Sequence, residues 1–204
     1  MALLRVDSSI RHDGSVSREL TGAVERAWRA AGPGGDVVHR DLAADPRLTG
    51  AWPQRSSVAA ALADEVLAAD AVVVGAPMYN FGIPAVVKSW IDLLIVDPRF
   101  DPRRTPPGTA LDGVPVVLAV ACGGGYGAGS PREGWDHATP YLRRIFADLF
   151  GADVTLLVAE LTAAADDPAL AELRHLAERS HADAVARAAA AGAAARRRVG
   201  LRTA

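Results

Sequence analysis

The stretch AVVVGAPMYNFGIPAVVKSWIDLL, residues 71–94, decides the fold. Its first six residues form an apolar, valine-rich run closed by Gly75 and Pro77, which predicts a buried parallel strand that ends abruptly. Pro84 then precedes apolar residues at helical spacing, which predicts a helix entered at its first turn, where proline is tolerated best. Because ligands of open α/β sheets bind beyond the carboxyl ends of the strands, we expect residues 78–82 to contact a ligand. These residues include two aromatic side chains, Tyr79 and Phe81, and the amide of Asn80, which suit a flat heterocycle with polar edges.

Composition favours one α/β domain over residues 1–204 with a small-molecule ligand. Half of the residues are apolar and the formal net charge is only −2, which argues against disorder and against a nucleic-acid partner. The single cysteine, Cys122, cannot form an internal disulfide, and the apolar run 1–4 is too short for a signal peptide. No apolar stretch approaches the roughly 20 residues of a membrane span. We therefore expect a cytoplasmic protein without a membrane partner.

The rest of the chain alternates between strand and helix patterns. Strands are expected at 2–6, 36–42, 71–76, 114–121 and 154–159, and helices at 17–31, 56–69, 84–95, 135–150 and 168–198, with Gly192 a weak point in the last helix. Residues 45–53 and the proline-rich residues 97–113 are expected to be loops. This alternation predicts a three-layer α/β fold around a five-stranded parallel sheet of order 2-1-3-4-5, with the polar second strand at an edge.

In that order, the loops after the first, third and fourth strands meet at one end of the sheet. The first loop places the hydroxyls of Ser9, Ser15 and Ser17 at a helix N-terminus, a combination that holds a phosphate, although the same serines could merely cap the helix. Neither G-x-x-x-x-G-K-[ST] nor G-x-G-x-x-G occurs there, which favours a mononucleotide over a tightly held dinucleotide.

The second and third loops offer a site for a ring. Met78, Tyr79 and Phe81 would form its apolar walls and Asn80 would lie along its edge, although aromatic residues here could equally fill the core. In the third loop, three glycines follow Cys122 and let the main chain approach a ligand closely, where N–H groups could stabilise negative charge on a ring. A flexible turn is the alternative interpretation.

Three segments together resemble a known family: DSSIRHDGSVSREL (7–20), PMYNFGIPAVVKSWIDLL (77–94) and ACGGGYGAGSPREGWDHATPYLRRIF (121–146). They resemble the FMN-dependent NADH azoreductases and NAD(P)H quinone oxidoreductases, whose fold is a flavodoxin-like three-layer sandwich. The resemblance covers nearly the whole chain. It implies FMN as cofactor, NADH or NADPH as electron donor, a quinone or azo compound as acceptor, and a homodimer in which the partner subunit roofs each site.

The resemblance also implies the residues that contact the cofactor. The phosphate and ribityl chain would be held by Ser9, Ser15, Val16 and Ser17, and the isoalloxazine would lie along Pro77, Met78, Tyr79, Asn80 and Phe81. The family's S-R-G-G segment falls on Ala121, Cys122, Gly123 and Gly124. Only its glycines are kept, so a hydroxyl and a cation near the flavin are lost, which leaves the substrate range and the flavin potential open.

Three residues are candidates for the substrate pocket. Phe100 is the one plausible ring-stacking residue of the 97–113 loop, which is either a substrate lid or a surface loop without a role. Tyr126 could line the pocket, and His137 could donate a proton or merely supply polarity at a helix start. Cys122 could be a redox thiol but is more typical of packing. The histidines have no metal-ligand spacing, so no metal site is expected.

These observations favour an FMN-dependent oxidoreductase that works by two half-reactions, with the cofactor rather than a catalytic side chain doing the chemistry. One alternative is a flavodoxin-like electron carrier, although such carriers usually present an acidic face and this chain is near neutral. Another is a flavin-dependent tailoring reductase of secondary metabolism, suggested by the altered third loop.

Overall fold

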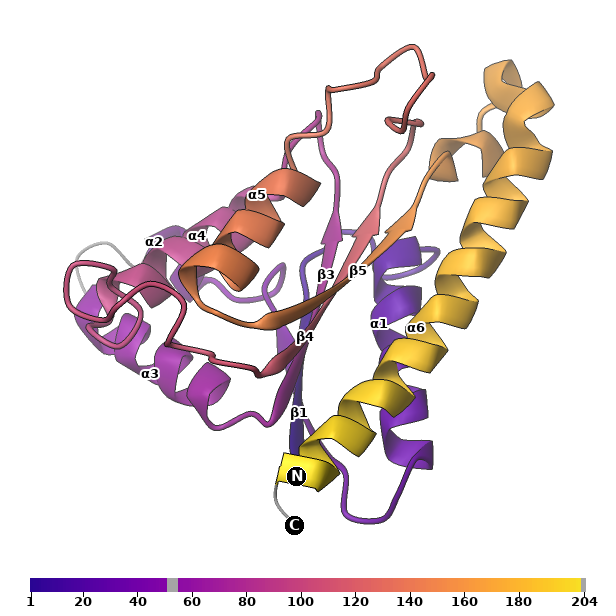
Figure 1. Ribbon diagram of the computed structural model, residues 1–204. Helices are drawn as coiled ribbons and strands as arrows, with labels where there is room; N and C mark the ends of the chain where they lie inside the picture. Colours follow the sequence, from indigo (N-terminus) through magenta and orange to yellow (C-terminus); the bar gives the residue numbers. More distant parts are fainter. Residues whose placement is uncertain (51–54, 203–204) are drawn as a thin grey trace.

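A five-stranded parallel sheet of order β2-β1-β3-β4-β5 forms the centre of the computed structural model, which describes residues 1–50 and 55–202 (Figure 1). The predicted strand order is therefore confirmed, with β2 at an edge. The strands are β1 (Ala2–Asp7), β2 (Asp36–Asp41), β3 (Ala71–Pro77), β4 (Pro115–Ala121) and β5 (Asp153–Ala159). Register pairs Pro77 with Ala121 and Ala121 with Ala159, so the carboxyl ends of β3, β4 and β5 lie side by side.

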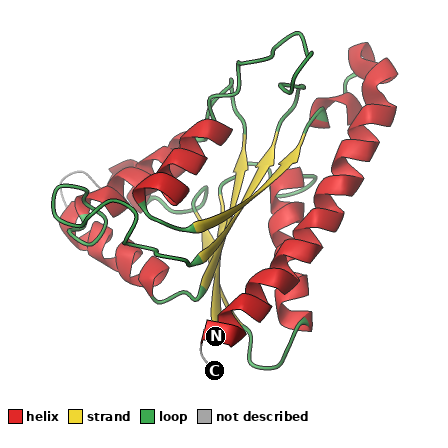
Figure 2. Cartoon of the chain, viewed as in Figure 1, coloured by secondary structure: helices red, strands yellow, loops and turns green. Residues whose placement is uncertain are grey.

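Helices cover both faces of the sheet (Figure 2). One face packs against α1 (Val16–Ala30) and α6 (Arg174–Arg202), and the other against α3 (Arg55–Leu67), α4 (Ala85–Val96) and α5 (Thr139–Arg143). Side chains of β3 alternate between the two cores, because successive strand residues point to opposite faces. All residues of β3 and β4 are buried as a result, which explains their continuous apolar sequences. Within residues 1–50 and 55–202, no helix is long and apolar enough to cross a membrane.

Two helices begin where the sequence indicates. Ser15 has the extended backbone of an N-cap, and its hydroxyl accepts the N–H of Arg18 at the start of α1. Pro84 directly precedes α4, whose buried side chains repeat at helical spacing: Val87, Trp90, Ile91, Leu93 and Leu94. These two helix starts flank the first and second loops at the carboxyl end of the sheet.

Three predicted boundaries are wrong. The helix expected from residue 135 begins at Thr139, because the Asp136 carboxylate accepts the N–H groups of Ala138 and Thr139 and so ends the preceding loop there. This helix continues as the π-helix η1 (Arg144–Leu149). The last α-helix, expected from residue 168, begins at Arg174. It is preceded by the 3-10 helices η2 (Thr162–Ala165) and η3 (Pro168–Leu173). The short helix α2 (Arg47–Gly50) replaces part of the loop expected at 45–53, whose residues 51–53 lie outside the described residues.

The segment 97–113 is irregular, as its prolines predict, but Phe100 does not face a ligand. Its side chain is 2% exposed and packs edge-on against Phe150, with ring centroids 4.9 Å apart. Hydrogen bonds from Arg99 to Asp97 and from Arg103 to Asp101 hold the turns on either side of it. The expectation that Phe100 stacks on a bound ring is therefore wrong, because burial in the core outweighs exposure in the loop.

Candidate functional site

A cavity of about 380 Å³ lies at the carboxyl end of the sheet, where the first and second loops and the start of the third meet. Most of the residues predicted to bind the cofactor line it: Ser9, Ser15, Val16, Ser17, Pro77, Met78, Tyr79, Ala121 and Gly123. Asn80, Phe81, Cys122 and Gly124 are outside its lining. The cavity therefore has hydroxyl groups and a helix N-terminus at one end and apolar side chains at the other.

The hydroxyl end is built on the first turn of α1. The Ser15 hydroxyl lies 3.3 Å from that of Ser17, and both precede Arg18 at the positively polarised end of the helix. Arg11 also lines the cavity and lies 3.7 Å from Asp166 on the opposite rim. Two hydroxyls, a guanidinium and a helix N-terminus are groups that bind a phosphate.

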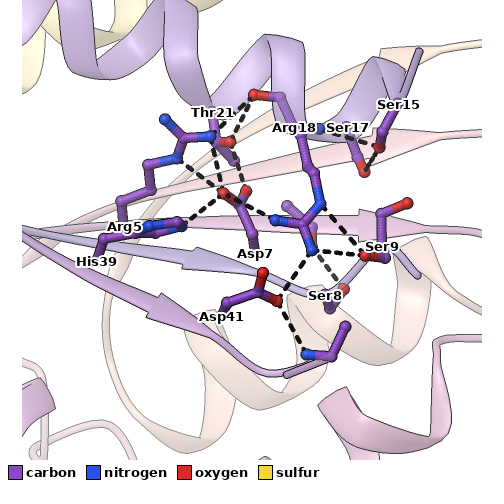
Figure 3. Close-up of polar contacts among 12 residues, drawn as sticks. Arg5, Asp7, Ser8, Ser9, Ser15, Ser17, Arg18, Thr21, His39 and Asp41 are labelled. Atoms are coloured by element: carbon purple, nitrogen blue, oxygen red, sulfur yellow. Dashed lines mark hydrogen bonds and ion pairs between the residues drawn. The ribbon is translucent and has the colours of Figure 1, made fainter. Parts of the chain in front are cut away.

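Arg18 holds the first loop in place through hydrogen bonds to Ser9 and Asp41 (Figure 3). Its Nε and Nη2 both donate to the carbonyl of Ser9, at 3.2 and 2.6 Å, and Nη2 also donates to Asp41 at 2.9 Å. Burial alone would raise the pKa of Asp41, but the hydrogen bond and charge of Arg18, with smaller contributions from the Ala43 N–H and the charge of His12, together lower that pKa. Arg18 thus ties Ser9 to the carboxyl end of the edge strand β2.

Asp7 supports the same loop from the end of β1. Its side chain is fully buried, and it accepts hydrogen bonds from Thr21 at 2.6 Å and from Arg5 at 2.9 Å, with the His39 ring nitrogen at 2.8 Å. A buried carboxylate needs such partners, because an unpaired one is strongly destabilising. The pattern of charges in the sequence does not reveal this network, because its members come from β1, α1 and β2.

The second loop is a tight turn in which Tyr79 and Gly82 exchange both backbone hydrogen bonds, at 3.0 and 3.1 Å. Asn80 and Phe81 at its tip have positive φ angles of 47° and 72°, which are uncommon for residues other than glycine. Such backbone conformations cluster at functional sites. The turn leaves Met78 and Tyr79 against the cavity, and the Tyr79 hydroxyl lies 3.5 Å from that of Ser9.

The tip of the second loop packs against the third. Phe81 makes edge-on contacts with Trp135 and Tyr126, at centroid distances of 5.3 and 6.2 Å. The N–H of Tyr126 donates to Glu160 at 2.7 Å, and the N–H of the exposed His137 donates to the carbonyl of Phe81. Tyr126 and His137 therefore hold the two loops together and do not line the cavity.

Cys122 belongs to the core rather than to the cavity. Its side chain is 1% exposed, and its N–H donates to the carbonyl of Ala159 at 2.8 Å. Burial, with smaller contributions from the charges of Asp136 and Glu160, raises the pKa of the Cys122 thiol to about 12. The thiolate is the reactive form of cysteine, so a redox role for this side chain is not supported.

We expect the Cys122 thiol to resist modification in the native protein. At pH 8, a disulfide reagent such as DTNB should release less than about a tenth of an equivalent of chromophore over an hour, because the thiol is both buried and protonated. The same sample should release a full equivalent after unfolding in guanidinium chloride. Rapid, complete reaction of the folded protein would contradict the burial of this residue.

The loop after β5 supplies four of the cavity residues that sequence analysis missed: Thr162, Ala163, Ala165 and Asp166. The others, Arg11 and Gly14, belong to the first loop. The N–H groups of Thr162 and Ala163 donate to the carbonyls of Cys122 and Gly123, which fastens this loop to the third one. Strand order could have identified it, because β5 lies next to β4 and ends at the same edge of the sheet.

Comparison with known proteins identifies the family. The family profile described as "Flavodoxin-like fold" matches residues 1–196. The chain is 39% identical over 203 residues to an FMN-dependent NADH:quinone oxidoreductase of Frankia casuarinae, covering 91% of this chain and 96% of that protein. This chain belongs to the flavodoxin-like family of FMN-dependent NADH:quinone oxidoreductases. A second member, from Nocardia farcinica, is 38% identical over 215 residues, covering 90% of this chain and 94% of that protein.

This member of the quinone oxidoreductase family has the same fold as a solved structure. The azoreductase from Bacillus anthracis matches with a TM-score of 0.75 at 23% identity, covering 95% of this chain and 99% of that one. The cavity also fits FMN on its own chemistry. The hydroxyls and the helix N-terminus suit a phosphate, and Met78 and Tyr79 suit the flat face of an aromatic ring.

Proposed function

We propose that this chain is an FMN-dependent oxidoreductase that takes electrons from NADH or NADPH and passes them to a quinone or azo compound. The observation that carries the proposal is the cavity, which joins a hydroxyl-lined helix N-terminus to an apolar wall in a member of this family. One domain formed by the whole chain would present this cavity.

The side chains of this protein bind and orient rather than react. FMN, when bound, accepts two electrons from a nicotinamide and delivers them to the acceptor. Ser15 and Ser17 would hold its phosphate, while Met78 and Tyr79 would flank its ring and exclude water. Ala121 and Gly123 have little or no side chain, so the main chain there can approach the ring closely.

Steady-state kinetics test the proposed function. The donor is NADH or NADPH and the acceptor is menadione or an azo dye. We expect parallel double-reciprocal plots, which are the kinetic pattern of a ping-pong mechanism. Activity confined to a single complex metabolite would instead support the tailoring reductase. Oxidation of NADH and NADPH at no useful rate would support the electron carrier.

We also propose that the FMN-loaded protein is a homodimer, as the family resemblance implies, and sedimentation equilibrium tests this. One exposed aromatic side chain beside the site supports the proposal, since Trp135 is 53% exposed where it packs against Phe81. The expected mass is that of two chains. The mass of one chain at micromolar concentration would contradict it.

Replacing Ser17 by alanine should raise the Kd for FMN about 10- to 100-fold and leave the Kd for riboflavin within threefold. Each lost hydrogen bond to a charged phosphate is worth about 1.5–3 kcal/mol, and riboflavin carries no phosphate. Isothermal titration calorimetry measures both constants. Ser89→Ala on α4, outside the cavity lining, is the matched control. Equal losses for both ligands would place the phosphate elsewhere.

A further inference from the structure

An exposed arginine, Arg132, lies beside the apolar end of the cavity. It belongs to the third loop, which extends beyond the carboxyl end of β4 (Figure 1). Gly123 of that loop lines the cavity. The guanidinium lies against the residue that follows, because a Cβ added to Gly124 would be 3.3 Å from the Nη1 atom of Arg132. A positive charge is therefore held next to the wall along which the flavin ring is proposed to lie.

Phe81 of the second loop positions this guanidinium. The Cζ atom of Arg132 lies over the Phe81 ring, 6.0 Å from its centroid, a distance at which an aromatic ring attracts a cation. Phe81 is in turn restrained by its edge-on contacts with Tyr126 and Trp135. Because the partner is a ring, the contact orients the cation without engaging its N–H groups in conventional hydrogen bonds.

The charge of Arg132 is not neutralised by the protein that surrounds it. Within residues 1–50 and 55–202, its guanidinium forms no ion pair with a carboxylate and donates no hydrogen bond. Three carboxylates of the third loop and of the end of β5 instead accept backbone N–H groups of residues 126–139: Glu133, Asp136 and Glu160. The donors of Arg132 are therefore available to an anionic group of a bound molecule.

We propose that Arg132 selects electron acceptors whose ring carries a carboxylate or sulfonate, by pairing with that group at the apolar end of the cavity. The inference rests on the proposed function. A guanidinium binds such an anion through two parallel hydrogen bonds. An acid group attached to the acceptor ring can reach Arg132 without a spacer. The phosphates of the nicotinamide donor are the less favoured partner, because a ribose separates the nearest of them from the nicotinamide ring.

Binding of two redox-inert ligands to the FMN-loaded protein tests the proposal without turnover. A naphthoate and the corresponding naphthamide have nearly the same shape and differ in charge, so calorimetric titration with both isolates the contribution of the carboxylate. Arg132→Met should raise the Kd of the naphthoate about 3- to 10-fold and change that of the amide less than twofold. Arg132→Lys keeps the charge but lacks the planar fork, so its Kd for the naphthoate should lie between those of wild type and Arg132→Met.

Reoxidation of the reduced protein gives a second readout. The FMN-loaded protein is reduced with a stoichiometric amount of dithionite and mixed anaerobically with an acceptor in a stopped-flow instrument. Arg132→Met should lower the second-order rate constant for a naphthoquinone sulfonate about 3- to 10-fold and that for neutral menadione less than twofold. Salt screens exposed charges, so about 0.5 M KCl should reduce the wild-type preference for the sulfonate more than that of Arg132→Met. Arg144→Met, which removes an exposed charge paired with Asp148, is the control and should match wild type.

The outcomes separate this inference from the proposed function. Equal losses for charged and neutral ligands in Arg132→Met would give Arg132 a structural role in holding the loops together, and would overturn the inference. A loss confined to reduction by NADH or NADPH would overturn it in favour of the donor phosphates. If neither naphthalene ligand binds measurably, the ratio of the two rate constants decides alone. A wild-type protein that neither quinone reoxidises overturns the proposed function, and this inference with it.

Discussion

Replacing Arg18 by methionine is expected to raise the Kd for FMN about 10- to 100-fold and to change the Kd for riboflavin less than threefold. The variant loses both hydrogen bonds to the Ser9 carbonyl and the bond to Asp41, which together hold the first loop against β2. Charge-assisted bonds of this kind contribute about 1.5–3 kcal/mol each, although loop rearrangement recovers part of that. Because the first loop is proposed to hold the phosphate, the loss should be specific to the phosphorylated ligand.

Two further variants separate positioning from charge. Arg18→Lys keeps the cation but lacks the planar fork that spans Ser9 and Asp41, so its Kd for FMN should fall between those of wild type and Arg18→Met. Arg29→Met, at the other end of α1, removes an exposed pair with Glu25 and should leave both constants unchanged. If Arg18→Met bound FMN as tightly as wild type, the first loop would not depend on this residue.

Gly192→Ala should lower the free energy of unfolding by about 2 kcal/mol and Tm by roughly 4–8 °C. In an exposed helix, the same substitution would add about 1 kcal/mol of stability through helix propensity. Here α6 crosses α1 so closely that a Cβ on Gly192 would clash with the Val24 carbonyl oxygen. The helices must therefore separate, and packing along both is lost.

Gly200→Ala on the same helix is the matched control, because a Cβ there would meet, among the described residues, just the flexible end of Met1, at 3.9 Å. Its expected effect is between zero and about 1 kcal/mol of added stability. Urea denaturation of both variants measures the difference. Equal, stabilising effects at the two positions would show that α6 does not contact the α1 backbone as described.

The sequence predicts the sheet well because its central strands β3 and β4 are buried on both faces. β3 and β4 read as continuous apolar runs, and alternation with helices then leaves few possible strand orders. The start of α4 is equally local, since Pro84 marks it. The first and second loops follow from the same reasoning, because strand ends determine where ligands bind.

The remaining features depend on partners that are distant along the chain. Gly192 looks like a weak point in a helix, yet α6 continues through it, and its small size is explained only by Val24 on α1. Phe100 looks like a lid residue until Phe150 is placed beside it. Arg11 and Asp166 come from different loops, so neither indicates a cavity rim by itself. Sequence patterns report local periodicity, and these positions are determined by tertiary contacts.

Anaerobic spectroscopy of the purified, FMN-reconstituted protein tests most directly the claim that this cavity binds a redox-active flavin. The protein should be yellow, about one equivalent of NADH or NADPH should bleach its visible flavin band, and about one equivalent of menadione should then restore it. A protein that stays colourless after reconstitution, or a bound flavin that neither nicotinamide reduces, would contradict the account.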